Sequence, residues 1–113
     1  MARLTIRIDF DDRRQLGHGK IKLLEMIALY GSISAAGRAM QMSYRRAWLL
    51  VEEINLMFAT PLVTKQLGGR GGGCANVTVL GRRIVELYRA IEKQSVHSLQ
   101  GQLSELENHL KRR

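Results

Sequence analysis

Three neighbouring side chains near the middle of the chain, Tyr44, Arg45 and Arg46, have the chemistry that nucleic-acid recognition needs. The planar guanidinium group of arginine can donate two parallel hydrogen bonds to a guanine edge, whereas a lysine offers only a point charge. Ser43 directly precedes them and is a residue type that caps helices, because its hydroxyl oxygen accepts a hydrogen bond from a free backbone amide. Adjacent arginines can also form the solvated face of an ordinary helix. We favour nucleic-acid contact because the first turn of a recognition helix usually meets base edges and phosphates.

A glycine-rich segment provides a second basic position. Five glycines surround Arg70 between Leu67 and Gly73. A nucleotide-binding P-loop is excluded because no Gly-Lys-Ser or Gly-Lys-Thr ending follows, and the dinucleotide fingerprint fails on its glycine spacing. We interpret the segment as a hairpin tip that lies along DNA, where glycine allows close approach and Arg70 contacts phosphate or the minor groove. A merely flexible hairpin tip is the alternative.

Catalytic and metal-binding residues are not expected. Cys74 is the single cysteine, so an internal disulfide is excluded and a thiolate zinc site lacks ligands. His18, His97 and His109 are too scattered in the sequence to form a transition-metal set. No nucleophile motif accompanies the serines, and the only glycine-rich source of amides for an oxyanion is already assigned to the hairpin tip. The sequence therefore predicts no enzyme, no metal site and no cofactor.

The length and charge of the chain fit one small domain with an acidic partner. The 113 residues include 18 Lys and Arg against 10 Asp and Glu, a formal net charge of +8. Such a surplus favours a polyanion such as double-stranded DNA. Arg3, Arg7 and Asp9 interrupt any apolar signal sequence, and no run approaches the roughly 20 apolar residues that span a bilayer. We expect a cytoplasmic protein without a membrane segment.

The first third of the sequence predicts a strand and a helix. Apolar residues alternate with polar ones over residues 3–10, the period of a strand with one buried face. The charged segment 11–19 is predicted as a loop. Apolar residues then recur at helical spacing from Ile21, and Gly31 ends this helix.

The next segment has the pattern of a helix-turn-helix. Ser32 or Ser34 can cap a short helix over residues 35–40, Gln41 and Met42 form the turn, and a third helix runs over residues 44–58 until Thr60 and Pro61 end it. Two helices that cross closely need small residues where they meet. The small residues Ala36, Gly37 and Ala47 are expected to pack there, which presents the first turn of the third helix outward.

A hairpin and a long helix complete the prediction. The β-prone stretches 62–67 and 75–79 flank the glycine-rich tip. Leucine and isoleucine then recur at helical spacing over residues 80–110, but their phase slips after Ile91 and Gly101 weakens the second half. One long helix or two helices with a kink are both expected at this stage.

The predicted fold class is mainly α with a small β wing. We expect a winged helix-turn-helix DNA-binding domain over residues 1–79, followed by a long dimerisation helix over residues 80–113. The apolar stripe of residues 80–110, with part of the first strand, would pair two copies. A two-fold dimer separates its recognition helices by about 34 Å, one turn of B-DNA, or a multiple of it.

Several motifs share one resemblance: the run from Gly31 to Gly37, the run from Met42 to Trp48, Glu53-Ile54-Asn55, Pro61-Leu62-Val63 and the glycine-rich tip. They resemble the amino-terminal domain of the ModE molybdate-responsive transcription regulators. They resemble the LysR-type DNA-binding domain more loosely. The resemblance covers about residues 20–92. It implies a winged helix and a long pairing helix that bind a palindromic operator of molybdate-uptake genes. In the full-length regulators molybdate-binding domains follow, whereas this chain stops at Arg113, so a response to an effector would need a separate sensing subunit or a site that this sequence does not show.

The expected function is therefore that of a sequence-specific, homodimeric transcriptional regulator. For Trp48, packing is the alternative to base contact. A winged-helix protein-interaction module without specific DNA binding is the alternative function, and an enzyme or metal-storage role is the third. The residues expected to contact DNA are Ser34, Ser43, Tyr44, Arg45, Arg46, Trp48 and Arg70.

Overall fold

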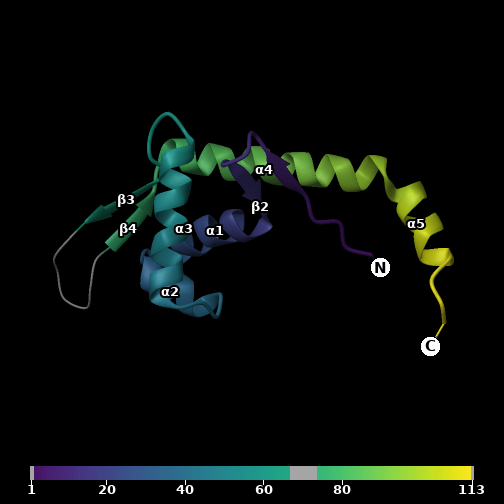
Figure 1. Cartoon of the computed structure of the whole chain (residues 1–113), viewed down its shortest axis with the longest axis horizontal. Coiled ribbons are helices and arrows are strands. Elements are labelled where there is room, and N and C mark those ends of the chain that lie inside the picture. Colours follow the sequence, from purple (N-terminus) through teal and green to yellow (C-terminus); the bar gives the residue numbers. More distant parts are fainter. Residues whose placement is uncertain (1, 67–73, 113) are drawn as a thin grey trace.

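The computed structural model describes residues 2–66 and 74–112, and this part of the chain is mainly helical with two short antiparallel strand pairs. The predicted class, mainly α with a small β component, is confirmed in this coarse form. Figure 1 shows the long helix α4 lying across the other helices, with the β3–β4 hairpin and α5 at opposite ends of the molecule. The elements in chain order are β1 (Arg7–Asp9), β2 (Gln15–Gly17), α1 (His18–Tyr30), α2 (Ile33–Ala39), α3 (Tyr44–Met57), β3 (Val63–Gln66), β4 (Cys74–Val77), α4 (Val79–Ser98) and α5 (Gln100–Asn108).

The amino-terminal strand differs from its prediction. Only Arg7–Asp9 of the expected strand 3–10 is paired, and its partner is β2, which lies in the segment predicted as a loop. The loop prediction for residues 11–19 was therefore wrong, since this segment also contains the first residues of α1. The pairing places Ile8 opposite Leu16, whose side chain is buried in the core.

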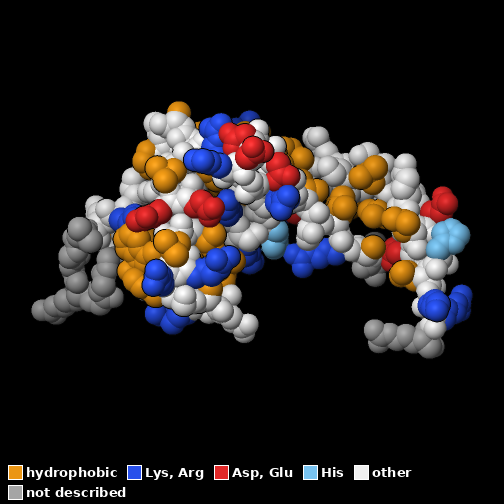
Figure 2. Space-filling view, viewed as in Figure 1, with side chains coloured by type: hydrophobic (Ala, Val, Ile, Leu, Met, Phe, Trp, Pro, Cys, Tyr) orange, Lys and Arg blue, Asp and Glu red, His pale blue; other side chains and the backbone are white. Residues whose placement is uncertain are grey.

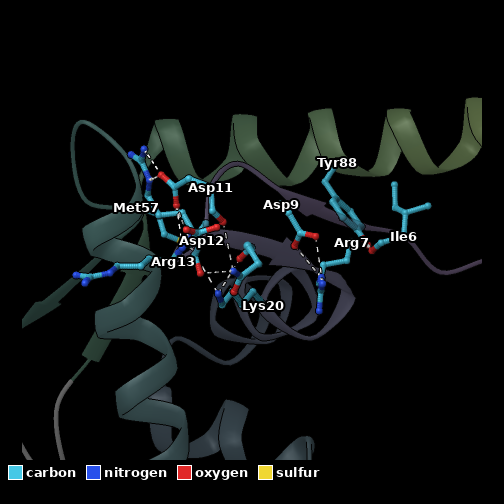
Figure 3. Close-up of polar contacts among 11 residues, drawn as sticks. Ile6, Arg7, Asp9, Asp11, Asp12, Arg13, Lys20, Met57 and Tyr88 are labelled. Atoms are coloured by element: carbon cyan, nitrogen blue, oxygen red, sulfur yellow. Dashed lines mark hydrogen bonds and ion pairs between the residues drawn. The ribbon is translucent and has the colours of Figure 1, made fainter.

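A tight turn joins β1 to β2. Asp11 Oδ1 accepts hydrogen bonds from the backbone amides of Arg13 and Arg14 at 3.0 and 2.8 Å, and its Oδ2 accepts one from Arg14 Nε at 2.6 Å. The hydrogen bonds from the Arg14 side chain and the Arg13 amide lower the pKa of the Asp11 carboxyl. The charged residues that suggested an open loop thus form an ordered turn. Figure 3 shows this turn close to Lys20 and Met57.

Helix α1 lies at the centre of the core. Its residues Ile21, Leu23, Leu24 and Ile27 are fully buried, and α2, α4 and β4 pack around it. Gly31 ends the helix as predicted, because its φ of 69° is in the left-handed region that glycine adopts readily.

The β3–β4 hairpin is attached to both α1 and α3. Val63, Ala75 and Val77 face the core, and the Ala75 amide donates to the carbonyl oxygen of Gly31 at 2.9 Å. Asn55 of α3 accepts hydrogen bonds from the amides at residues 62 and 63 through Oδ1, and donates to the Val63 carbonyl through Nδ2. The predicted hairpin is confirmed, while its tip at residues 67–73, including Arg70, lies outside the described residues.

Helices α4 and α5 are the kinked pair that was one of the two expectations for residues 80–110. The helix breaks at Leu99, and α5 runs in a different direction from α4 (Figure 1). Tyr88 of α4 is buried, and its hydroxyl donates to the carbonyl oxygen of Ile6 at 2.6 Å (Figure 3). Burial raises the pKa of this hydroxyl. The contact holds the amino-terminal segment against α4.

An ion-pair network joins α4 to α1. The Arg89 guanidinium donates to both carboxylate oxygens of Glu25, at 2.7 and 3.1 Å, and to Glu92 at 2.7 Å. Hydrogen bonding to Arg89 lowers the pKa of the Glu25 carboxyl, although burial acts in the opposite direction. None of the helices in residues 2–66 and 74–112 has the length and hydropathy of a membrane span.

Two helical glycines give a matched test of this packing. A Cβ atom at Gly81 would lie 2.5 Å from the carbonyl oxygen of Leu62 and 2.7 Å from Val77 Cγ1, whereas one at Gly101 would meet no atom within 4 Å. We expect Gly81→Ala to lower the free energy of unfolding by roughly 1–3 kcal/mol, because backbone and strand must shift. Gly101→Ala should leave it unchanged or raise it by up to about 1 kcal/mol, because alanine favours a helix. Urea denaturation followed by circular dichroism measures both, and equal effects would contradict the packing.

Candidate nucleic-acid interface

The crossing of α2 and α3 sets the position of the candidate interface. Ala36, Gly37 and Ala47 are buried where the two helices meet. A Cβ atom at Gly37 would lie 3.0 Å from Ala47 Cβ, so glycine allows the close approach. The prediction that small residues pack at this crossing is confirmed.

The turn between the two helices is short and defined. Ser32 caps α2 by accepting a hydrogen bond from the Ala35 amide at 3.1 Å, so the first of the two predicted caps is the one used. Gln41 has a φ of 59°, which reverses the chain after α2, and the Met42 amide donates to the carbonyl oxygen of Gly37 at 3.0 Å. Residues 40–43 therefore hold α3 at a fixed angle to α2.

The first turn of α3 is exposed. Ser43 caps the helix, and its hydroxyl oxygen accepts a hydrogen bond from the Arg46 amide at 3.1 Å. Tyr44 is 57% exposed, and Arg45 and Arg46 are exposed as well. Neither arginine takes part in the ion pairs found among residues 2–66 and 74–112. The opposite face of α3 is buried, so the helix presents two unneutralised cations to solvent.

The two arginines have different surroundings. Arg46 lines a groove of about 320 Å³ between α3 and the amino-terminal hairpin, which it shares with Arg7 and Lys20. The ammonium group of Lys20 donates to the carbonyl oxygen of Gln15 at 2.7 Å (Figure 3). Arg45 does not line this groove. Of the two, Arg45 is therefore the freer to reach a partner in front of α3.

The other sequence-predicted residues are distributed as follows. Ser34 lies on α2, half-buried, with its hydroxyl 3.1 Å from that of Ser32. Trp48 is half-buried and packs edge-on against Tyr44, with ring centroids 5.9 Å apart. The structure thus brings Ser43, Tyr44 and the arginines into one turn, with Trp48 directly behind them. Arg70 lies outside the described residues.

Two cations on the elements that adjoin α3 in the chain were missed from the sequence. Arg38 is exposed in the last turn of α2, and Lys65 of β3 places its Nζ atom 3.7 Å from the centroid of the Trp48 ring. Strand alternation could have indicated Lys65, since it shares a face with the buried Val63 and so points toward the helices. Its contact with Trp48 depends on tertiary structure.

The described residues show no metal-binding arrangement. Within residues 2–66 and 74–112, no group of three or more His, Cys, Asp or Glu side chains is placed to hold a metal ion. Cys74 is exposed at the start of β4 and is unpaired with any other cysteine. The side chains described around the first turn of α3 are cations and aromatic rings.

Comparison with known proteins gives a consistent set of relatives. No protein-family model matches the chain. It is 40% identical over 92 residues to the molybdenum transport protein ModE of Azotobacter vinelandii, covering 81% of this chain and 33% of that protein. It is 41% identical over 78 residues to the molybdenum-pterin-binding protein MopB of Rhodobacter capsulatus, covering 69% of this chain and 29% of that protein. It is 42% identical over 69 residues to the DNA-binding transcriptional dual regulator ModE of Escherichia coli K12, covering 61% and 26%.

The resemblance to ModE regulators that the motifs indicated is confirmed, and the chain is ModE-like. It spans about a third or less of the length of these relatives. The names of the relatives describe regulators and molybdenum-binding or transport proteins, and none of the three describes an enzyme.

The cap of α3 can be tested by mutation. Ser43→Ala removes the oxygen that accepts from the Arg46 amide, so we expect the free energy of unfolding to fall by about 1 kcal/mol. Ser43→Asp should retain most of the stability, because a carboxylate can accept the same hydrogen bond. Urea denaturation of both variants measures the effect. If alanine and aspartate lower the stability equally, the hydroxyl does not act as a cap.

Proposed function

We propose that this ModE-like chain is a homodimeric, sequence-specific DNA-binding protein that regulates transcription through a winged helix-turn-helix. The observation that carries the proposal is the exposed first turn of α3, where Arg45 and Arg46 have no carboxylate partner among the described residues. The major groove of B-DNA, about 12 Å wide, admits one helix. Arginine at the start of such a helix can bind guanine with two hydrogen bonds.

The β3–β4 hairpin is proposed as the wing. It is fixed to the end of α3 by the three hydrogen bonds of Asn55, so its position relative to the recognition helix is defined. Its tip carries Arg70 among glycines in the sequence. An arginine there would add a phosphate contact beside the groove that α3 occupies.

The charge of the chain supports DNA as the partner. A net charge of +8 attracts the phosphate backbone, and the counterions released on binding add affinity that does not depend on sequence. The name of the Escherichia coli relative includes DNA binding, and that of the Azotobacter vinelandii relative includes molybdenum transport. We therefore propose a palindromic operator of molybdate-uptake genes as the target.

The dimer is proposed to form through α4, α5 and the amino-terminal segment. Hydrophobic side chains gather on the distal part of α4 and on α5 in Figure 2, away from the core. Leu106 is 67% exposed and Leu110 is 70% exposed. Apolar side chains that gather in one exposed patch typically mark an interaction surface. The Ala2 amide donates to Glu107 Oε2 at 3.0 Å, which places the amino-terminal segment beside the same surface.

The division of roles between α3 and the wing can be measured on duplex DNA. Duplexes selected from a random pool give the preferred site, and a random duplex gives the reference. Arg45→Ala should cost about 1–3 kcal/mol on the preferred duplex and less on the random one, because a base contact is lost. Arg70→Ala should weaken both duplexes similarly. Fluorescence anisotropy measures the dissociation constants.

The matched control for this experiment is Arg13→Ala. Arg13 is exposed in the turn between β1 and β2 and lies near Met57, at the opposite end of α3 from Arg45. Its replacement should leave both affinities nearly unchanged. Equal losses for Arg45→Ala and Arg70→Ala on both duplexes would show that α3 does not read bases, and weak binding insensitive to sequence would favour a protein-interaction module.

The dimer surface can be tested by sedimentation. The wild-type chain should sediment as a dimer at micromolar concentration. Leu106→Glu places a charge in the proposed interface and should shift the chain toward monomer. Leu56→Glu is the control, because Leu56 is 84% exposed on α3 and lies outside the proposed surface. A monomeric wild-type chain, or identical behaviour of the two variants, would overturn this surface.

A further inference from the structure

Lys65 lies on the inward face of β3, where the alternation of buried and exposed residues predicts an apolar side chain. It lies on the same strand face as the buried Val63 and is paired in register with the buried Ala75. Its side chain is half-buried, and no ion pair among residues 2–66 and 74–112 includes it. A lysine here needs a partner for its ammonium group other than a carboxylate.

That partner is the face of Trp48. Lys65 Nζ lies 3.7 Å from the centroid of the Trp48 ring, well within the range of a cation–π contact. The ring in turn meets Tyr44 edge-on at 5.9 Å. Tyr44, Trp48 and Lys65 therefore form a row that runs from the first turn of α3 to the hairpin, and the ammonium group lies where the two elements meet.

The nature of this contact leaves the charge available. A carboxylate partner would neutralise the ammonium, whereas an aromatic face attracts it through the ring quadrupole and leaves its net charge intact. The four-carbon stem of lysine packs along the apolar surface while its charged end stays near water. The structure thus holds an unneutralised cation at the junction of the proposed recognition helix and the proposed wing.

We propose that Lys65 is a contact to the DNA phosphate backbone, and that Trp48 is a positioning residue that holds it there. The inference rests on the proposed function, in which α3 enters the major groove. With α3 in the major groove, a phosphate group that borders the groove would face this junction. Trp48 then acts through Lys65, and the base contact considered for Trp48 from the sequence is not needed.

The salt dependence of binding tests the proposal, because each phosphate neutralised by a cation contributes about 0.9 to the slope of log affinity against log salt concentration. Lys65→Met keeps an apolar stem and removes the charge. We expect a roughly three- to tenfold loss of affinity on preferred and random duplexes alike, with the slope reduced by about 1. Lys65→Arg keeps the charge and can stack on Trp48, so it should retain the wild-type slope.

Trp48→Leu tests whether Trp48 positions Lys65. It should weaken binding in the wild-type background and have little further effect beside Lys65→Met, because both changes remove the same placed cation. Arg13→Met is the matched control for the loss of one charge, since Arg13 is exposed in the turn between β1 and β2, near Met57 at the carboxyl end of α3 and outside the proposed dimer surface (Figure 3). Its slope should equal that of the wild type. Circular dichroism at the assay temperature confirms that each variant is folded.

The outcomes distinguish the role of Lys65 from the proposed DNA-binding function. If the wild-type chain binds no duplex, both proposals are overturned. If the wild type binds and Lys65→Met keeps the wild-type slope, Lys65 serves only to pack the hairpin and this inference alone is overturned. Fully additive losses for Trp48→Leu and Lys65→Met would remove the positioning role of Trp48 and leave Lys65 as an independent contact.

Discussion

The close approach of α2 and α3 at Gly37 and Ala47 decides where the first turn of α3 lies. The two Cβ positions would be only 3.0 Å apart, so a larger residue on either side would separate the helices. Because the buried face of α3 is held in this way, its polar face must point outward, and the cap at Ser43 fixes the residue at which the helix begins. The placement of Arg45 and Arg46 follows from packing on the far side of the helix.

The hairpin depends on the same helix through different contacts. Asn55 bonds the backbone where β3 begins, and Lys65 lies over Trp48 nearer the first turn of α3. The hairpin is thus fixed to α3 at two points along the helix. This matters for the proposed function, because a helix and a wing can contact one duplex together only if the angle between them is defined.

The amino-terminal hairpin and α4 form the other half of the structure. The buried hydroxyl of Tyr88 binds the Ile6 carbonyl, and Arg89 joins Glu25 of α1. These polar contacts attach α4 to the helices that carry the candidate interface. A partner bound along the exposed stripe of α4 and α5 would therefore have a fixed position relative to α3. DNA binding by a two-fold symmetric dimer requires such a fixed position.

The sequence by itself determined α1 to α3, the short turn between α2 and α3 and the β3–β4 hairpin, because caps, breakers and apolar periodicity are local signals. Gly31 and Ser43 act on residues close to them in the chain, as the end of one helix and the cap of another. Gly37 and Ala47 allow close packing because they are small. The pairing of β1 with β2 was missed, since it depends on a turn built from charged side chains and on burial of Leu16. Only the tertiary structure decided that the helix breaks at Leu99 and that Lys65 meets Trp48, because these outcomes depend on which surfaces the folded chain brings together rather than on neighbouring residues.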